Sequence, residues 1–105
     1  MHDFTVIVLP GAFASSVALT LDILTTAATL APRRGLPVPR WQVCSPARGA
    51  VRLGTHLQLR AEAMPRIADP QSCWIVPGLG CEDPEAIGER LRDPDMWGVL
   101  RAMRA

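Results

Sequence analysis

The clearest pattern in the chain is an unbroken apolar run near its amino end, from Phe4 to Leu9. The run is rich in β-branched residues and is closed by Pro10-Gly11, which is typical of a strand buried on both faces inside a parallel sheet. Two apolar stripes at helical spacing follow: Val17, Leu21, Leu24 and Ala28, then Leu19, Ile23, Ala27 and Leu30. We therefore expect a helix that ends near Ala31 and is packed under other elements on most of its sides.

Later apolar segments alternate with polar and turn residues, as strands do. We expect two more strands of the main sheet, over 40–44 and 73–76, and a short hairpin between them, over 51–53 and 56–59. Residues 61–69 are expected to form a loop with a short helical turn, because prolines bracket this segment.

Two helices are predicted in the last quarter of the chain. Each begins with an acid followed by proline, Asp83-Pro84 and Asp93-Pro94, and these residues suit the N-cap and the first helical position. The inner face of the last helix is expected to consist of Met96, Trp97, Leu100 and Met103. The order of strand, helix, strand, hairpin, strand, helix and helix predicts one α/β domain over residues 1–105, with a mostly parallel sheet.

Composition adds little to this picture. The net charge is +1, with 20% of the residues charged, and this gives no electrostatic signal for nucleic acid. No uninterrupted apolar run reaches the roughly 18 to 20 residues of a membrane span, and no basic segment precedes the first strand as in a signal peptide. The three cysteines have no paired spacing, which fits a reducing compartment. We expect a cytoplasmic protein with no membrane contact.

Two predicted strand ends carry the same Pro-Gly signal, with the glycines at Gly11 and Gly78. In an open parallel sheet, the loops at the carboxyl ends of the strands line the crevice where ligands bind. Glycine in such a loop lets backbone N–H groups approach a ligand closely. A ligand-binding role is one interpretation of both glycines, and a tight exit turn is the other.

Asp22 is the only charged residue within the predicted first helix. A carboxylate among apolar side chains is costly unless it is paired, so a buried Asp22 would contact a ligand or a neighbouring thiol. The alternative interpretation is an exposed helix position, or one close to an arginine.

No residue is predicted to be catalytic. Cys44 and Cys73 lie in predicted strands, where small buried thiols are common and inert. Cys81 follows a glycine-rich loop and precedes a helix start, which favours a thiolate, but no base lies near it in the sequence. The histidines and cysteines lack metal-ligand spacing, and Gly78-Leu79-Gly80 lacks the third glycine of a dinucleotide fingerprint. We therefore expect no metal and no cofactor.

In the order of its elements the chain resembles the ThiJ/PfpI superfamily, whose domains have the class I glutamine amidotransferase-like fold. It most resembles the amidase-like sensor domain at the N-terminus of certain AraC-type transcriptional regulators. The matching segments are VIVLPG at 6–11, SVALTLDIL at 16–24, VCSP at 43–46, the hairpin at 51–59 and WIVPG at 74–78. Asp22 falls where this group carries its helix acid, usually a glutamate.

The resemblance implies a flavodoxin-like three-layer sandwich, of which this chain is the first half. It implies a truncated, non-catalytic sensor domain that binds a small-molecule effector through Asp22, Gly11 and Gly78. DNA binding would belong to a helix-turn-helix region that is absent here. A third interpretation, separate from the resemblance, is a small structural or interaction module that forms a homodimer to cover its open sheet edge. The alternative is a fragment of a stand-alone ThiJ/PfpI-type hydrolase or isonitrile hydratase-like enzyme that lacks its nucleophile. Leu79 replaces a glycine that is common in the group, which bears on any oxyanion loop.

Overall fold

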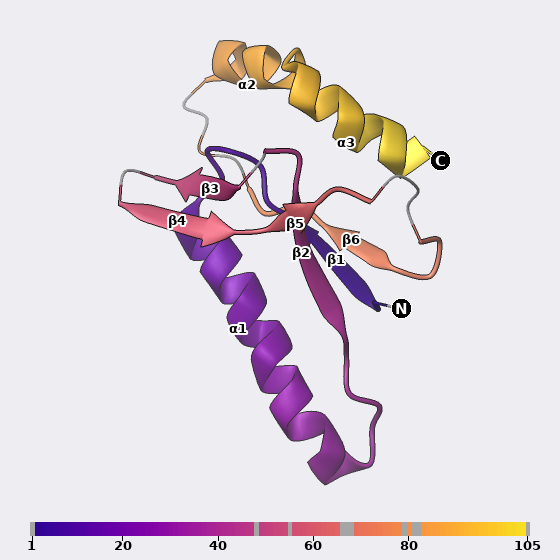
Figure 1. Cartoon of the computed structure of the whole chain (residues 1–105). Helices are drawn as coiled ribbons and strands as arrows, with labels where there is room; N and C mark the ends of the chain where they lie inside the picture. Colours follow the sequence, from indigo (N-terminus) through magenta and orange to yellow (C-terminus); the bar gives the residue numbers. More distant parts are fainter. Residues whose placement is uncertain are drawn as a thin grey trace.

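The structure, a computed structural model, describes residues 2–47, 49–54, 56–65, 69–78, 80 and 83–104. Its elements are β1 (Phe4–Ile7), α1 (Ala14–Leu30), the 3-10 turn η1 (Ala31–Arg34), β2 (Trp41–Ser45), β3 (Ala50–Leu53), β4 (Leu57–Arg60), β5 (Glu62–Ala63), β6 (Cys73–Ile75), α2 (Pro84–Leu91) and α3 (Pro94–Arg104) (Figure 1). Every strand and helix predicted from the sequence is present.

Four strands form a parallel sheet in the order β5-β2-β1-β6, and β3 pairs with β4 in a separate antiparallel hairpin. β1 lies in the middle, with Phe4 opposite Trp41 of β2 on one side and opposite Cys73 of β6 on the other. The prediction of a mixed α/β protein with a parallel sheet is confirmed.

The segment predicted to be a loop at 61–69 contains the short strand β5 instead. β5 pairs in parallel with β2, with Glu62 opposite Cys44 and Ala63 opposite Ser45. The prediction was wrong because two paired residues are too few to produce an alternating pattern that the sequence would show.

β1 and the residues that follow it are buried on both faces, as predicted. Alternate side chains point to opposite faces of a strand, so this segment contributes to two apolar clusters. One cluster lies between the sheet, α1 and β3, and the other between the sheet and α3, on the opposite side (Figure 1). The first contains Val6, Val8, Ala12, Val17, Leu24, Val51 and Leu53, and the second contains Ile7, Leu9, Cys44, Met96 and Val99.

The polar group that β1 buries is satisfied within the sheet layer. Thr5 is 1% exposed, and a hydrogen bond of 2.8 Å joins its Oγ1 to Oγ of Ser72. The same oxygen accepts a hydrogen bond of 3.1 Å from Nε2 of Gln42. The side chains of β1, β2 and the β6 entry are thereby fixed to one another as well as through the backbone.

The helix boundaries follow the predicted signals. Oδ1 of Asp83 accepts a hydrogen bond of 2.8 Å from the N–H of Ala86, as an N-cap residue does. α1 ends at Leu30 and passes into η1, which closes at Gly35 with a φ of +66°. This left-handed conformation explains why glycine suits the end of the first helical segment.

α3 turns a different face to the sheet from the one predicted. Met96 is buried as predicted, and Val99 and Ala102 are buried with it. Trp97 and Leu100 are exposed instead, so the prediction for these two was wrong. The helix carries two neighbouring apolar stripes, and the pattern alone does not tell which of them meets the sheet. The side chain of Met103 lies outside the described residues.

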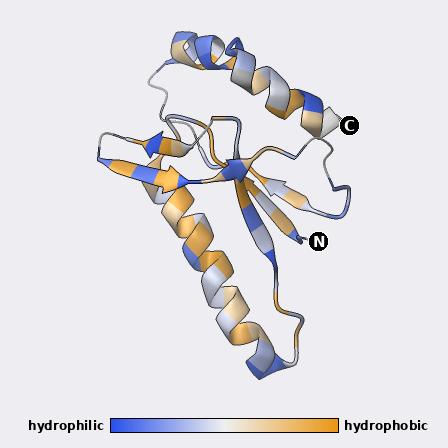
Figure 2. Cartoon of the chain, viewed as in Figure 1, coloured by the Kyte–Doolittle hydropathy of each residue, from blue (hydrophilic) through white to orange (hydrophobic). Residues whose placement is uncertain are grey.

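α1 is far more exposed than predicted. Only Val17 and Leu24 are buried within it. The second apolar stripe, which we call the outer stripe (Leu19, Ile23, Ala27 and Leu30), is exposed to solvent. The sheet and the β3–β4 hairpin cover one side of the helix, and hydrophobic residues continue beyond that side (Figure 2). The expectation of a helix covered on most sides was therefore wrong for this chain.

The segment Ala14–Arg34 is long and apolar enough, by length and composition, to cross a membrane. Counting only uninterrupted apolar residues missed this, because serines, threonines and Asp22 divide the segment into short runs. Core helices of soluble proteins and signal sequences meet the same test. Here Val17 and Leu24 belong to the core between α1 and the sheet.

Candidate functional site

The two Pro-Gly loops meet at one edge of the sheet, because β1 and β6 are parallel neighbours whose carboxyl ends lie side by side. The N–H of Phe13 donates a 2.9 Å hydrogen bond to the carbonyl of Gly78, and the N–H of Gly80 donates a 2.8 Å hydrogen bond to the carbonyl of Gly11. The structure thus brings together two of the three predicted site residues, Gly11 and Gly78, and joins their loops through the backbone.

The two glycines differ in how strongly the backbone requires them. Gly11 has a φ of +85°, and a Cβ placed on it would lie 2.6 Å from Nη2 of Arg90. Gly78 is not left-handed, and a Cβ on it would meet only the ring of Phe13, at an ordinary 3.8 Å. Any other residue at Gly11 would therefore be strained and would displace Arg90, whereas Gly78 leaves room for a small side chain.

Arg90 is a site residue that sequence reasoning missed. It lies in the last turn of α2, and its half-buried guanidinium group lies over Gly11. Within the described part of the chain this guanidinium has no carboxylate partner. An arginine in the last turn of a helix is common, so no sequence signal distinguishes it. Only the packing of α2 brings it to the Pro-Gly loops.

Two further residues lie at this edge of the sheet and were also missed. The N–H of Gly11 donates a 3.4 Å hydrogen bond to the carbonyl of Arg52, which ties the loop to β3. The ring of Phe13 lies beside Gly78 and Gly80 and is 53% exposed. This edge of the sheet therefore offers one cation and one exposed aromatic ring, a set that suits a small anionic organic molecule.

The structure does not bring Asp22 to the two glycines. Asp22 is exposed on α1, and its position is about 12 Å along the helix axis from the first helical residue, Ala14. No hydrogen bond or ion pair joins it to another residue that the structure describes. This is the exposed position that was one of the two interpretations of Asp22, and a role in ligand binding stays a prediction.

The cysteines occupy two kinds of environment. Cys44 is 1% exposed, as expected, and burial, together with the negative charge of Glu62, raises the pKa of its thiol. Cys73 was also expected to be buried but is exposed, because β6 is an edge strand of the sheet. Cys81 and Leu79 lie outside the described residues. Among the residues that are described, no three His, Cys, Asp or Glu side chains gather in a way that would hold a metal ion.

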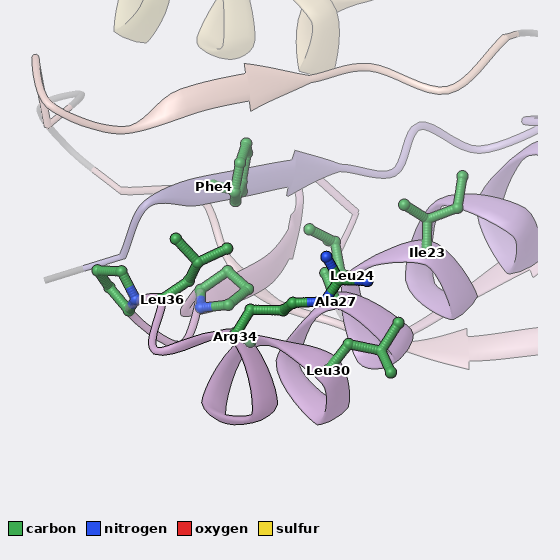
Figure 3. A pocket seen from close by; sticks show the side chains of 10 residues that line it. Phe4, Ile23, Leu24, Ala27, Leu30, Arg34 and Leu36 are labelled. Atoms are coloured by element: carbon green, nitrogen blue, oxygen red, sulfur yellow. The ribbon is translucent and has the colours of Figure 1, made fainter.

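In the described part of the chain, two cavities are lined by residues outside the glycine loops. A cavity of about 280 Å³ lies at the carboxyl end of β2, lined by Ser45, Ala47, Ala63 and Met64 among others. A larger groove, of about 560 Å³, runs along the carboxyl-terminal half of α1 and under the connector that leads to β2 (Figure 3). Phe4, at the start of β1, lines this groove, so it lies at the opposite end of the sheet from the Pro-Gly loops.

Comparison with known proteins gives no match: no family model, no curated protein and no solved structure is significantly similar to the chain. Its function is therefore inferred from its own residues and geometry.

Proposed function

We propose that the chain is the N-terminal part of the ligand-sensing domain of an AraC-type transcriptional regulator. In this proposal the domain has the ThiJ/PfpI-like, class I glutamine amidotransferase-like fold, a flavodoxin-like three-layer sandwich. It binds a small-molecule effector without catalysing a reaction. The observation that carries the proposal is the meeting of the two Pro-Gly loops, at Gly11 and Gly78, at the carboxyl edge of the parallel sheet.

The strand order supports this fold. The chain passes from β1 to β2 on one side and then returns to place β6 on the other side of β1. Doubly wound sheets of the flavodoxin-like kind begin with this order, and they bind ligands where the direction of winding changes. That point lies between the carboxyl ends of β1 and β6, where Gly11 and Gly78 are found.

The chemistry of the Pro-Gly loops and their neighbours supports a binding role and indicates the class of effector. The guanidinium of Arg90 over Gly11 favours a ligand with a carboxylate or another planar anion. This cation fits a sensor of a small organic acid.

Exposed apolar residues support a larger intact domain. On α2 and α3 these are Ile87, Leu91, Trp97 and Leu100, and β6 forms one edge of the sheet. In the intact regulator, further strands and helices would cover these surfaces, and a helix-turn-helix region would contact DNA. Such a regulator acts in the cytoplasm.

The binding role is tested by titrating the isotope-labelled chain with a panel of small carboxylates, amino acids and dicarboxylates among them, and recording amide spectra. We expect the largest shifts at Gly11, Phe13, Gly78 and Gly80. We also expect Gly11→Ala to weaken binding at least about tenfold, because the added Cβ would collide with Arg90.

Gly35→Ala is the matched control. Gly35 also has a left-handed φ, +66°, but a Cβ on it would meet nothing within 4 Å, and it lies at the far end of α1. Both variants carry the backbone strain, so only a loss of binding specific to Gly11→Ala supports binding at the Pro-Gly loops. Equal losses in the two variants, or shifts confined to other parts of the chain, would contradict the proposal.

The coding sequence beyond Ala105 separates the regulator from the enzyme. Two in-frame helix-turn-helix units after the remainder of the domain would support the regulator. A cysteine at a strand-to-helix elbow, followed by a histidine and then by the end of the protein, would instead support the hydrolase or isonitrile hydratase-like alternative.

A further inference from the structure

The groove of about 560 Å³ at the carboxyl-terminal end of α1 is lined almost wholly by apolar side chains (Figure 3). Two of the residues that line it, Leu24 and Ala31, are buried in the core. Three others are exposed and form its rim: Ile23, Leu30 and Leu36. The groove therefore extends from the surface to the core, and its volume lies within the roughly 300 to 1,000 Å³ of small-molecule sites.

The wall of the groove opposite α1 is the connector to β2, and backbone hydrogen bonds hold this connector at both ends. The N–H of Leu36 donates a 3.0 Å hydrogen bond to the carbonyl of Ala31 in η1. At the other end, the N–H of Phe4 in β1 donates a 3.1 Å hydrogen bond to the carbonyl of Arg40. Between these points two prolines with fixed φ line the groove, Pro37 and Pro39. A wall held in this way needs little ordering when a ligand binds.

One cation lies in this otherwise apolar groove. Arg34, in η1, is the only charged residue among the described residues that line it. Figure 3 shows its side chain extending from η1 along the groove, toward Leu24 and Ala27. Within the described part of the chain, its guanidinium group has no hydrogen-bond or ion-pair partner. The groove therefore combines apolar walls with a single cation that is open to an anion.

We propose that this groove binds a medium-chain aliphatic carboxylate. The carboxylate pairs with the planar guanidinium of Arg34, which matches its geometry, and the alkyl chain lies along the apolar walls. On α1 the groove runs from Ile23 to Leu30, about 10 Å at 1.5 Å per residue. An extended alkyl chain advances about 1.3 Å for each carbon–carbon bond of about 1.5 Å, so about eight carbons span this wall.

Other occupants fit the groove less well. A neutral apolar molecule would cover the guanidinium of Arg34 without supplying an anion, which is costly for a charged group. A single alkyl chain is narrow enough to enter the groove and reach Leu24 and Ala31, whereas a bilayer surface would contact only the exposed rim. The site lies at the opposite end of the sheet from the Pro-Gly loops, so it does not depend on the effector site proposed there.

Isothermal titration calorimetry of the full chain with butanoate, hexanoate and octanoate, all below their micelle concentrations, tests the proposal. Each added methylene should lower the dissociation constant about threefold to fourfold, because it is buried against the apolar walls. Methyl octanoate, which has no charge, should bind at least about tenfold more weakly than octanoate. In amide spectra we expect octanoate to shift Ala27, Leu30, Arg34 and Leu36, and not the Pro-Gly loops.

Two matched pairs of variants locate the site. Arg34→Gln should weaken octanoate binding at least about tenfold, whereas Arg33→Gln should change it less than about twofold. Both arginines are exposed in η1, and only Arg34 lines the groove. Ala27→Phe should weaken binding at least about tenfold by filling the groove. Ala18→Phe is its control, because Ala18 is exposed on the same helix and does not line the groove. Circular dichroism establishes that all four variants are folded.

Equal weakening within either pair would overturn the proposal, as would binding that does not depend on chain length. Shifts confined to the Pro-Gly loops would place the carboxylate at the proposed effector site and would likewise overturn it. Co-sedimentation with phospholipid vesicles in place of saturable binding would show that a bilayer covers the groove. The same amide shifts on raising the protein concentration without any carboxylate would show that a second copy does. Either result would contradict a carboxylate site.

Discussion

β1 and the outer stripe of α1 are comparably apolar in sequence but lie in opposite environments. Val6, Ile7 and Val8 are 0% exposed, whereas Leu19 and Ile23 of α1 are more than half exposed. Both segments predict burial by composition, and only the strand is buried by its own chain. Hydrophobic patterning therefore indicates that a surface is to be covered, and it does not indicate which molecule covers it.

The difference has a geometric cause. A strand in the middle of a sheet has two faces, and this chain supplies α1 for one and α3 for the other. A helix packed on a sheet turns only one strip of its circumference to that sheet. In α1 this strip holds Val17 and Leu24, so the described part of the chain leaves the outer stripe uncovered.

Matched isoleucine substitutions give the strongest test of this contrast. We expect Ile7→Ala to lower the free energy of unfolding by about 3 kcal/mol, because Ile7 is fully buried and its loss leaves a cavity. Ile23→Ala should change it by no more than about 0.5 kcal/mol at concentrations where the chain is monomeric. Urea unfolding followed by circular dichroism measures both.

The comparison fails if the two substitutions have equal effects in the monomer, because the outer stripe would then be covered by the chain itself. Raising the protein concentration sharpens the test. If self-association covers the outer stripe, the effect of Ile23→Ala should increase with concentration, while that of Ile7→Ala should not.

Much of the fold could be predicted because its signals are local. The apolar run of β1, the proline and glycine at its end and the Asp83 cap each act within a few residues, and the structure has all of them. β5 could not be predicted, because it consists of two residues whose strand conformation depends on pairing with β2. The orientation of α3 could not be predicted either, because the helix has two apolar stripes and its packing against the sheet decides which one is buried. The exposure of the outer stripe has the same origin.

The candidate site also combines residues that local sequence signals predicted with residues that only packing brings together. Gly11 and Gly78 could be found because a repeated turn motif at the ends of parallel strands places both loops on one edge. Arg90 and Arg52 reach this edge through packing between segments distant in sequence, and nothing in their local sequence marks them. Asp22 was selected as a lone charge in an apolar helix, and the helix turned that position to solvent.

A matched pair of threonines tests whether β1 also fixes its polar groups more tightly than α1 does. Oγ1 of the buried Thr5 bonds to Ser72 and Gln42, whereas Oγ1 of the exposed Thr29 bonds only to the carbonyl of Thr25 in its own helix. We expect Thr5→Val to lower the free energy of unfolding by about 1 to 2 kcal/mol, because it removes a partner from both groups. Thr29→Val should have an effect below about 0.5 kcal/mol. Equal effects in urea unfolding would mean that the Thr5 hydrogen bonds are replaced by water at no cost.

The smallest expected effect concerns Cys44, which packs in the cluster of Ile7 beneath α3. Burial, and then the charge of Glu62, raises the pKa of this thiol, so the folded chain holds its proton more tightly than the unfolded chain does. Well below the ordinary cysteine pKa of about 8.5 the thiol is protonated in both states, and the chain keeps its full stability. As the pH rises past that value the unfolded chain ionises first, so the free energy of unfolding decreases until the folded thiol ionises as well.

Cys44→Ala isolates this effect. The substitution removes the titrating thiol, and the stability that it loses through poorer packing is the same at every pH. We expect the wild-type chain to lose stability relative to Cys44→Ala between pH 8 and pH 10 in urea unfolding, with no relative change between pH 6 and pH 7. If the wild type and Cys44→Ala keep a constant difference up to pH 10, the Cys44 thiol is not shielded from water. The core on the α3 side of β1 would then be as open as the outer stripe of α1, and the contrast between strand and helix would hold on one face of the sheet only.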